Sequence, residues 1–414
     1  MKIIKHIIST VVLVAACYAP AMAQSSITPY SKLGYGVLSD NATGIQRAMG
    51  GVGIAMQNGR QINVMNPASY SQVDSLTFLW DMGIDVTNCW SKESGKSGYS
   101  LGGGLDYITM EFRLAKNIGA AIGVVPFSSV GYSFGGEIEN GSDSRIGSGG
   151  LSELFAGVGW QPIKGLSIGA NFSYLFGTTT NTTNVEYTST TQFTRNLEVR
   201  DWNMRAGLQY AFNISRKNKI VLGLTYSPKK SLHGKAWGTM ADVSQDTKLD
   251  TVNRVNMKGN YELPQTFGVG ISYTYDNRLN FEVDYTYQQW SKAKYTPIDY
   301  FEAPQTKWND RWKVAAGLSY LPNPRGNYLN RMTYRVGAFY NSDYMNVSGN
   351  DVRDYGVGLG FSFPALAGNK TLVNLGVEWR HRYTAPTNLL KEDYLNITVS
   401  VNFNEMWFWK NKIR

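Results

Sequence analysis

The stretch that decides the fold is LNFEVDYTY at residues 279–287, in which apolar and polar residues alternate without a break. Successive side chains of an extended strand point to opposite faces, so this alternation gives one apolar face and one polar face. The stretch ITVSVNF at residues 397–403 repeats the pattern. Both stretches predict strands that separate an apolar environment from water.

The same kind of segment recurs fourteen times along the chain, with a length near ten residues and aromatic residues at the ends. The segments lie near residues 75–88, 104–114, 119–130, 151–161, 166–178, 198–212, 219–227, 265–275, 279–290, 308–320, 329–341, 351–363, 371–382 and 393–403. A soluble sandwich also alternates, but Tyr and Trp at strand ends favour a membrane interface. The gaps alternate between short and long, as periplasmic turns and outer loops do. We therefore predict an all-β fold, a 14-stranded antiparallel transmembrane β-barrel over residues 75–403, in the outer membrane of a Gram-negative-type bacterium.

Residues 253–262 could form a fifteenth strand. An extra spanning strand would place the tight turn at residues 276–278 on the outer side of the membrane. It would also make the final strand run in the wrong direction. Treating residues 228–264 as one long outer loop restores the alternation, so fourteen strands are expected.

The composition agrees with a strand-rich membrane protein. The chain has 414 residues, of which 13% are aromatic and 43 are Gly, which argues against a disordered chain or a coiled coil. After the first 20 residues, no stretch approaches the roughly 18 apolar residues that a membrane helix needs. The formal net charge of +9 suits contact with outer-membrane lipid and the phosphates of lipopolysaccharide.

The first 23 residues have the pattern of a signal peptide. Lys2 and Lys5 precede an apolar run, and Ala-Met-Ala at residues 21–23 matches a small-x-small cleavage site. The residues before Cys17 also resemble a lipoprotein box, so lipidation of Cys17 is the alternative to cleavage after Ala23.

Residues 24–74 form a long leader without sustained alternation. The leader carries Gly50, Gly51 and Gly53 and then the sequence Asn66-Pro67-Ala68. A structureless segment of this length in a compact protein is unusual unless it packs somewhere, and a barrel of this size has a lumen that needs filling. The leader is therefore expected to be a hatch, or plug, inside the lumen.

At this point the chain resembles the FadL family of outer-membrane channels for long-chain fatty acids and other hydrophobic compounds. The resemblance rests on Asn66-Pro67-Ala68 after the Gly-rich leader, LPQ at residues 263–265 followed by GVG, the FEVDYTY stretch ending in Trp290, and WKVAAGLSY at residues 312–320. It implies a hatch with an Asn-Pro-Ala motif and passive uptake of a hydrophobic small molecule. The molecule would leave sideways through the barrel wall.

The resemblance also implies a lateral opening at an inward kink of the third strand. Here that strand carries Pro126 and Phe127. Proline cannot donate to a strand ladder, so Pro126 is the candidate for the opening, and an ordinary bulge or strand end is the alternative.

Charged residues predicted in the lumen supply candidate polar contacts. Arg47 in the leader is a candidate partner for Glu282 or Asp284, because charges shielded from water need partners. Alternatively, Glu282 and Asp284 only line a wet lumen.

Two features depart from the FadL pattern. Residues 404–414 follow the last strand and contain Trp407, Phe408 and Trp409 with basic residues, which predicts a periplasmic tail that anchors at the membrane interface or docks a partner. The early outer loops also lack an obvious long apolar hairpin, which leaves the substrate open.

Catalysis, metal binding, cofactors and nucleic acid are not expected. Downstream of the signal peptide the chain has His233, His381 and Cys89, far apart in sequence, and the glycines at residues 50–53 lack the spacing of a nucleotide loop. The sequence therefore predicts a non-enzymatic channel for a hydrophobic small molecule. The alternative is a non-transport subunit or shuttle of an outer-membrane protein assembly or secretion complex.

Overall fold

The computed structural model describes residues 27–242, 250–299, 301–302, 308–365 and 371–406. The expected signal peptide, Cys17 and the aromatic residues Trp407, Phe408 and Trp409 lie outside the described residues.

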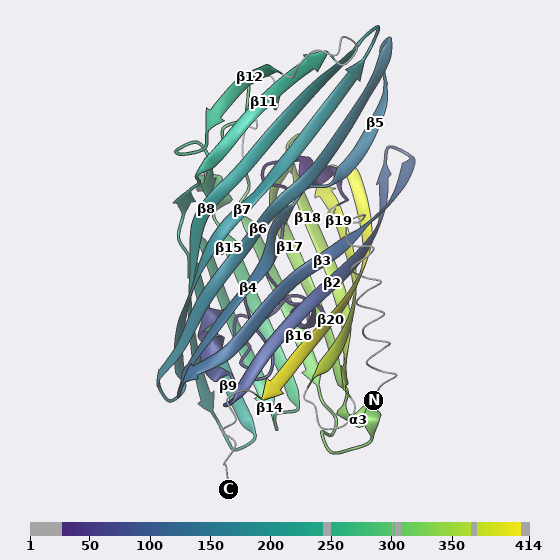
Figure 1. Cartoon of the computed structure of the whole chain (residues 1–414). Coiled ribbons are helices and arrows are strands. Elements are labelled where there is room, and N and C mark those ends of the chain that lie inside the picture. Colours follow the sequence, from purple (N-terminus) through teal and green to yellow (C-terminus); the bar gives the residue numbers. More distant parts are fainter. Residues whose placement is uncertain (1–26, 243–249, 300, 303–307, 366–370, 407–414) are drawn as a thin grey trace, which may run out of the picture.

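The described residues form one closed antiparallel barrel of fourteen strands, which confirms the predicted fold class (Figure 1). The strands are β2 (Thr77–Glu93), β3 (Lys96–Ala115), β4 (Ile118–Ser129), β6 (Gly141–Ile163), β7 (Leu166–Glu186), β8 (Thr190–Asn213), β9 (Asn218–Ser227), β14 (Thr266–Tyr275), β15 (Leu279–Gln288), β16 (Arg311–Tyr320), β17 (Thr333–Val347), β18 (Asn350–Pro364), β19 (Leu372–Ala385) and β20 (Leu390–Met406). The barrel closes where β2 pairs with β20, from Thr77 opposite Met406 to Glu93 opposite Leu390. β20 thus continues three residues past the predicted end at 403.

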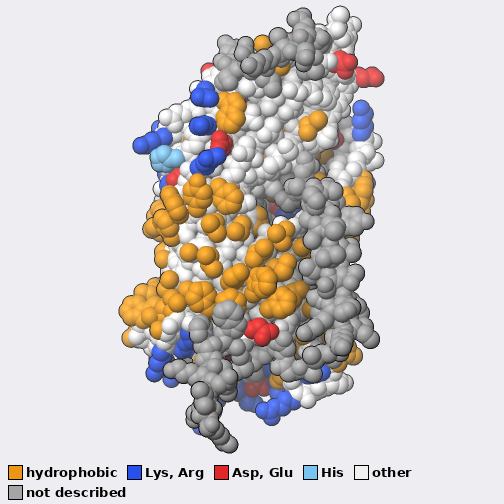
Figure 2. All heavy atoms as spheres, viewed as in Figure 1, with side chains coloured by type: hydrophobic (Ala, Val, Ile, Leu, Met, Phe, Trp, Pro, Cys, Tyr) orange, Lys and Arg blue, Asp and Glu red, His pale blue; other side chains and the backbone are white. Residues whose placement is uncertain are grey.

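The alternation in β15 sets the two faces of the wall. Phe281 and Tyr285 are 45% and 42% exposed on the outer face, whereas Glu282 and Asp284 are buried on the inner face. The other strands repeat this arrangement, and their outward apolar side chains form the belt seen in Figure 2. Charged side chains lie above and below the belt in this view, as expected for a membrane-spanning barrel (Figure 2).

The long outer gaps are mostly strand extensions rather than loops. β2 and β3 meet at a tight turn beside Ser94 and Gly95, and β6, β7 and β8 reach 23, 21 and 24 residues. Thr182 opposite Thr194 is typical of the extensions of β7 and β8, which are largely polar on both faces. The alternation that marks a membrane-spanning strand is therefore absent there, although Thr favours strands.

Residues 228–264 contain no fifteenth spanning strand within the part that the structure describes. β9 pairs directly with β14, with Ser227 opposite Thr266. The intervening chain forms β10 (Lys230–Ser231), β11 (Gly234–Asp242), β12 (Asp250–Asn256) and β13 (Glu262–Leu263). β11 extends the sheet on β8, and β12 pairs with β11.

The remaining elements are short. They are β1 (Val37–Leu38), β5 (Tyr132–Ile138), the helices α2 (Gly44–Arg47) and α3 (Tyr328–Arg331), and the 3-10 helices η2 (Pro29–Lys32), η3 (Pro67–Gln72) and η5 (Trp290–Lys292). No helix in the described ranges is long and apolar enough to cross a membrane. We call residues 27–76 the N-terminal segment, and this segment packs against the inner faces of the barrel strands.

Candidate functional site

Asn66, Pro67 and Ala68 begin η3 inside the barrel. The Asn66 side chain caps the helix, because its Oδ1 accepts a hydrogen bond from the Ala68 N–H at 3.1 Å. Its Nδ2 donates to the Ile54 carbonyl at 2.7 Å, which ties two parts of the N-terminal segment together. The three residues are fully buried or nearly so, and their hatch role stays a prediction.

Glycines of the barrel wall make room for this segment. A Cβ on Gly159 of β6 would lie 2.7 Å from the Pro67 carbonyl oxygen, and a Cβ on Gly317 of β16 would lie 2.5 Å from the Met49 carbonyl oxygen. Gly337 of β17 lies against the Met49–Gly50 peptide in the same way. The small residues therefore let the N-terminal backbone approach the wall closely.

The predicted glycines of the leader serve a tight turn. Gly50 and Gly51 have φ angles of +77° and +83°, a left-handed conformation that glycine adopts without strain. A Cβ on Gly50 would lie 2.6 Å from the Ala338 carbonyl oxygen of β17. Gly53 follows the turn and donates its N–H to Asp284.

Glu282 and Asp284 of β15 hold the N-terminal segment through its backbone. Asp284 Oδ2 accepts hydrogen bonds from the N–H groups of Gly53 and Ile54 at 2.7 and 2.9 Å. Glu282 Oε1 accepts one from the N–H of Ala55 at 2.9 Å. Both carboxyl groups are buried, so they do not simply line a wet lumen.

The predicted partner of Arg47 is wrong. The Arg47 guanidinium lies 2.6 Å from Asp106 Oδ2, on β3, rather than against Glu282 or Asp284. The register between β2 and β3 shifts beside Gly83, so Asp106 has no direct partner on β2 and its side chain lines the lumen cavity described below. Burial alone would lower the pKa of Arg47, but the carboxyl of Asp106 holds this pKa above its ordinary value.

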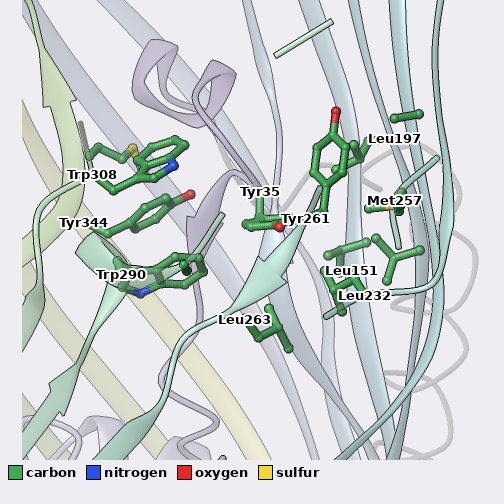
Figure 3. Packing of buried hydrophobic residues seen from close by; sticks show 14 of the residues in the cluster. Tyr35, Leu151, Leu197, Leu232, Met257, Tyr261, Leu263, Trp290, Trp308 and Tyr344 are labelled. Atoms are coloured by element: carbon green, nitrogen blue, oxygen red, sulfur yellow. The ribbon is translucent and has the colours of Figure 1, made fainter. Parts of the chain in front are cut away.

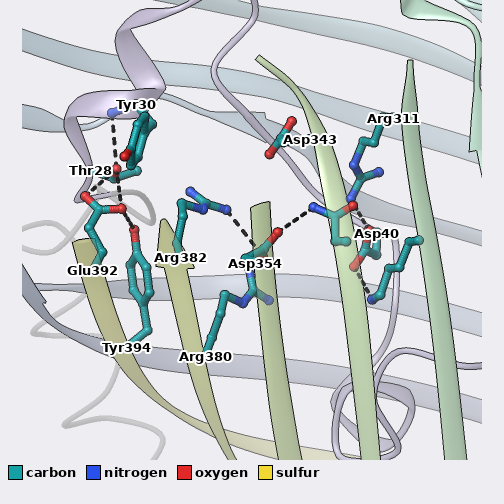
Figure 4. Close-up of polar contacts among 12 residues, drawn as sticks. Thr28, Tyr30, Asp40, Arg311, Asp343, Asp354, Arg380, Arg382, Glu392 and Tyr394 are labelled. Carbon is teal, nitrogen blue, oxygen red and sulfur yellow. Dashed lines mark hydrogen bonds and ion pairs between the residues drawn. The ribbon is translucent and has the colours of Figure 1, made fainter. Parts of the chain in front are cut away.

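A second ion-pair cluster lies around Asp40, a residue that the sequence analysis did not single out. Its two carboxyl oxygens lie 2.6 Å from Arg311 Nη2 and 2.6 Å from Lys313 Nζ on β16 (Figure 4). Burial alone would raise the pKa of Asp40, but the two cations hold this pKa below its ordinary value. The segment between η2 and α2 is thus tied to the wall by charge.

A cavity of about 190 Å³ lies between these two clusters. Eleven of its lining residues are charged: Asp40, Arg47, Asp85, Asp106, Arg311, Lys313, Asp343, Asp354, Glu378, Arg380 and Arg382. Asp354 lies 3.7 Å from both Arg380 and Arg382, so neighbouring strands contribute opposite charges (Figure 4). Apolar side chains such as Leu105 and Phe339 also line the cavity, but an apolar molecule inside it would remove water from the charged groups.

Pro126 and Phe127 lie just past the point where the ladder between β3 and β4 ends. Pairing between β3 and β4 ends at Ile108 opposite Val124, two residues before Pro126. Beyond that point β4 pairs with β1 of the N-terminal segment, with Leu38 opposite Ser128. We call this place the β3–β4 seam. Pro126 lines the charged cavity there, and its role as a lateral opening stays a prediction.

Aromatic residues fill the lumen on the other side of the charged cavity. Tyr35 of the N-terminal segment packs against Trp290, whose ring stacks on Tyr344 with centroids 4.5 Å apart (Figure 3). Trp308 and Tyr295 extend this group, which we call the aromatic cluster. Tyr35, Trp290 and Tyr344 are at most 2% exposed. The cluster belongs to a larger hydrophobic core that includes Leu residues of β6, β7 and β8.

Solved structures with a similar fold are hydrocarbon channels and a FadL homologue. The Pseudomonas putida toluene transporter TodX has a TM-score of 0.61 and 16% identity, over 90% of this chain and 100% of that one. The Ralstonia pickettii toluene transporter TbuX has a TM-score of 0.60 and 14% identity, over 88% and 98%. A Pseudomonas aeruginosa FadL homologue has a TM-score of 0.63 and 10% identity, over 90% and 99%. At such identities the likeness concerns the fold.

Among curated proteins, none matches the sequence. The family model described as BamG matches residues 3–414, which is nearly the entire chain and includes every strand of the barrel. The chain therefore belongs to the BamG family.

Proposed function

We propose that this protein is a closed barrel that works as a subunit or shuttle of an outer-membrane protein assembly or secretion complex. The observation that carries the proposal is the filled lumen. The N-terminal segment is bonded to the wall along its length, and the cavity that reaches the β3–β4 seam is lined by eleven charged residues.

A hydrophobic molecule on a path to the seam would displace water from those ion pairs. Removing solvent from charged groups costs several kcal/mol per ion, and an apolar molecule returns no hydrogen bonds. A hydrophobic path would therefore require most of the ion pairs to separate or move. A structural subunit requires no such path.

The test is native mass spectrometry of the protein extracted gently from its own outer membrane. We expect a stable protein partner in fixed stoichiometry and no bound apolar molecule. An isolated barrel that carries a fatty acid or an aromatic hydrocarbon would overturn the proposal.

The second candidate is the channel for a hydrophobic small molecule. The specific observation in its favour is the β3–β4 seam, where the ladder ends beside Pro126. Replacement of Pro126 by Val should then restore strand pairing and reduce uptake of a hydrophobic compound. Pro162→Val, at the periplasmic end of β6, is the control. Unchanged uptake with a correctly assembled Pro126→Val barrel would exclude the seam as the exit.

The predicted tail at residues 404–414 is a candidate periplasmic docking peptide under this proposal. Its first residues, Asn404 and Glu405, lie in β20, and Trp407, Phe408 and Trp409 fall outside the described residues. Removal of residues 407–414 should weaken recovery of the partner if the tail docks it. Full recovery with normal barrel assembly would remove this role.

A further inference from the structure

We infer that the outer half of β3, residues 96–106, is an open strand edge that pairs with a β-strand of a second outer-membrane protein. The inference rests on the proposed function and names where the partner binds. It concerns the backbone edge and an extended polypeptide, not the passage of a small molecule through the seam.

One side of this part of β3 is fully paired and the other is not. On the β2 side the ladder is continuous from Leu105 opposite Ile84 to Lys96 opposite Glu93. On the other side pairing with β4 stops at Ile108, and β4 then turns to β1. β5 pairs with β6, so no described strand covers the outer half of β3. The β2–β3 hairpin projects from the side of the barrel in Figure 1.

The middle of the open edge lacks the usual protection against strand addition, and the two charged residues of the segment, Lys96 and Asp106, lie at its ends. Residues 97–105 read SGYSLGGGL, without a charge or a proline. Natural edge strands carry Lys, other charges or Pro that keep further strands away. The edge strand β12 follows this rule with Arg254, and β5 carries Glu137. β3 differs, which indicates that its edge is covered in the functional state.

The inner end of the edge lies at the membrane boundary. Leu105 lies about ten residues from the periplasmic turn, which is the length of chain that a tilted strand needs to cross the apolar core. Its outward side chain is 56% exposed, and those of Leu101 and Tyr99 are 49% and 58% exposed. Leu105 and Asp106 therefore lie at the outer limit of the apolar core and residues 96–104 lie beyond it, so the cost of unpaired backbone groups against lipid applies to the inner end of the edge.

The geometry selects an extended chain as the occupant. The edge presents successive backbone N–H and C=O groups at the spacing of a β-strand. Only the backbone of another extended chain can form hydrogen bonds with all of them. Gly102, Gly103 and Gly104 place no side chain in its way. The outward residues Tyr99, Leu101 and Leu105 predict a partner strand with an apolar outward face, as strands of outer-membrane barrels have.

The first experiment places a photo-crosslinking amino acid at Leu101 in the living cell. Ile146 on β6 is the matched control, because it is 44% exposed and β6 is paired there with both β5 and β7. We expect one outer-membrane protein crosslinked at position 101 and not at position 146. Equal products at both positions, or a product with a second copy of this chain, would overturn the inference.

The second experiment introduces a charge on the edge, with Leu101→Lys compared with Ile146→Lys. We expect at least a tenfold drop in recovered partner for Leu101→Lys alone, with both barrels still migrating as folded species before heating. A partner recovered equally from both variants would overturn the edge inference and leave the proposed function intact. Absence of any partner in the unmodified protein would instead overturn the proposed function. If the Leu101→Lys barrel does not assemble, the photo-crosslink at position 101 decides whether the edge binds a partner.

Discussion

Asp40 is a single side chain that joins the N-terminal segment to two cations of β16. Asp40→Asn leaves Arg311 and Lys313 without their anion at a largely buried site. We expect a loss of about 3 kcal/mol in the free energy of unfolding, because a broken buried pair leaves charge uncompensated. Denaturant unfolding in detergent, followed by Trp fluorescence, measures it. Asp74→Asn breaks the exposed pair with Arg60 and should cost at most about 1 kcal/mol. Equal losses would contradict this reading.

The Asp40 carboxyl group also predicts how the free energy of unfolding depends on pH. Its pKa is lower in the folded protein than its ordinary value of 3.8, so the folded state holds the ionised form more tightly. The stabilisation is complete above that ordinary value and decreases as the pH falls below it towards the folded pKa. The wild-type unfolding free energy should therefore decline more steeply than that of Asp40→Asn below pH about 4. Parallel curves in acid unfolding would refute this assignment.

The sequence singles out a functional residue only when that residue belongs to a recognisable local motif. Asn66-Pro67-Ala68 stands out in the sequence because Asn and Pro punctuate the chain after the Gly-rich turn; its burial is observed, and its hatch role stays a prediction. The partner of Arg47 could not be predicted, because Asp106 depends on a register shift that leaves no mark in the alternation. Asp40 carries no motif at all, and only the fold brings it beside Arg311.

Close contact between the N-terminal segment and the wall depends on glycines of the strands. Gly337→Ala adds a Cβ against the Met49–Gly50 peptide, where there is no space. We expect the segment to be displaced while the barrel still assembles, so a protease should cleave the segment at a rate at least several-fold higher. Gly136→Ala in β5, whose Cβ would meet only Asp143 Oδ1 at 4.0 Å, is the control. If both variants resist the protease equally, the barrel wall accommodates the added Cβ at Gly337 without displacing the N-terminal segment.

Strands could be predicted from the sequence where one face meets lipid, because apolar and polar residues then alternate. Where neither face meets lipid, the alternation is absent and the strand could not be recognised. β15 and β20 alternate because one face meets lipid and the other faces the lumen. The outer extensions of β7 and β8 are polar on both faces, so the sequence analysis took residues 179–197 as a loop. The hairpin of β11 and β12 was missed for the same reason.

At the scale of the whole molecule, two layers of different chemistry lie in the lumen. The aromatic cluster around Trp290 and Tyr344 is buried and apolar, and the ion pairs of Asp40 and Arg47 tie the N-terminal segment to the wall. We propose that each layer closes the barrel independently, so that loss of one layer leaves the other in place. We expect almost no conductance in planar bilayers from the wild type, from Trp290→Ala with Tyr344→Ala, or from Asp40→Asn.

Combining the three substitutions should produce stepwise conductance, because neither layer then holds the segment in the lumen. Folded, heat-modifiable barrels in every sample are the control for assembly. If the aromatic double variant already conducts at the level of the triple variant, the charged layer contributes no closure and the barrel has one gate. A silent triple variant would instead mean that the glycine contacts and the carboxylates of β15 suffice to hold the segment, which would make the barrel a more permanent scaffold than two layers imply.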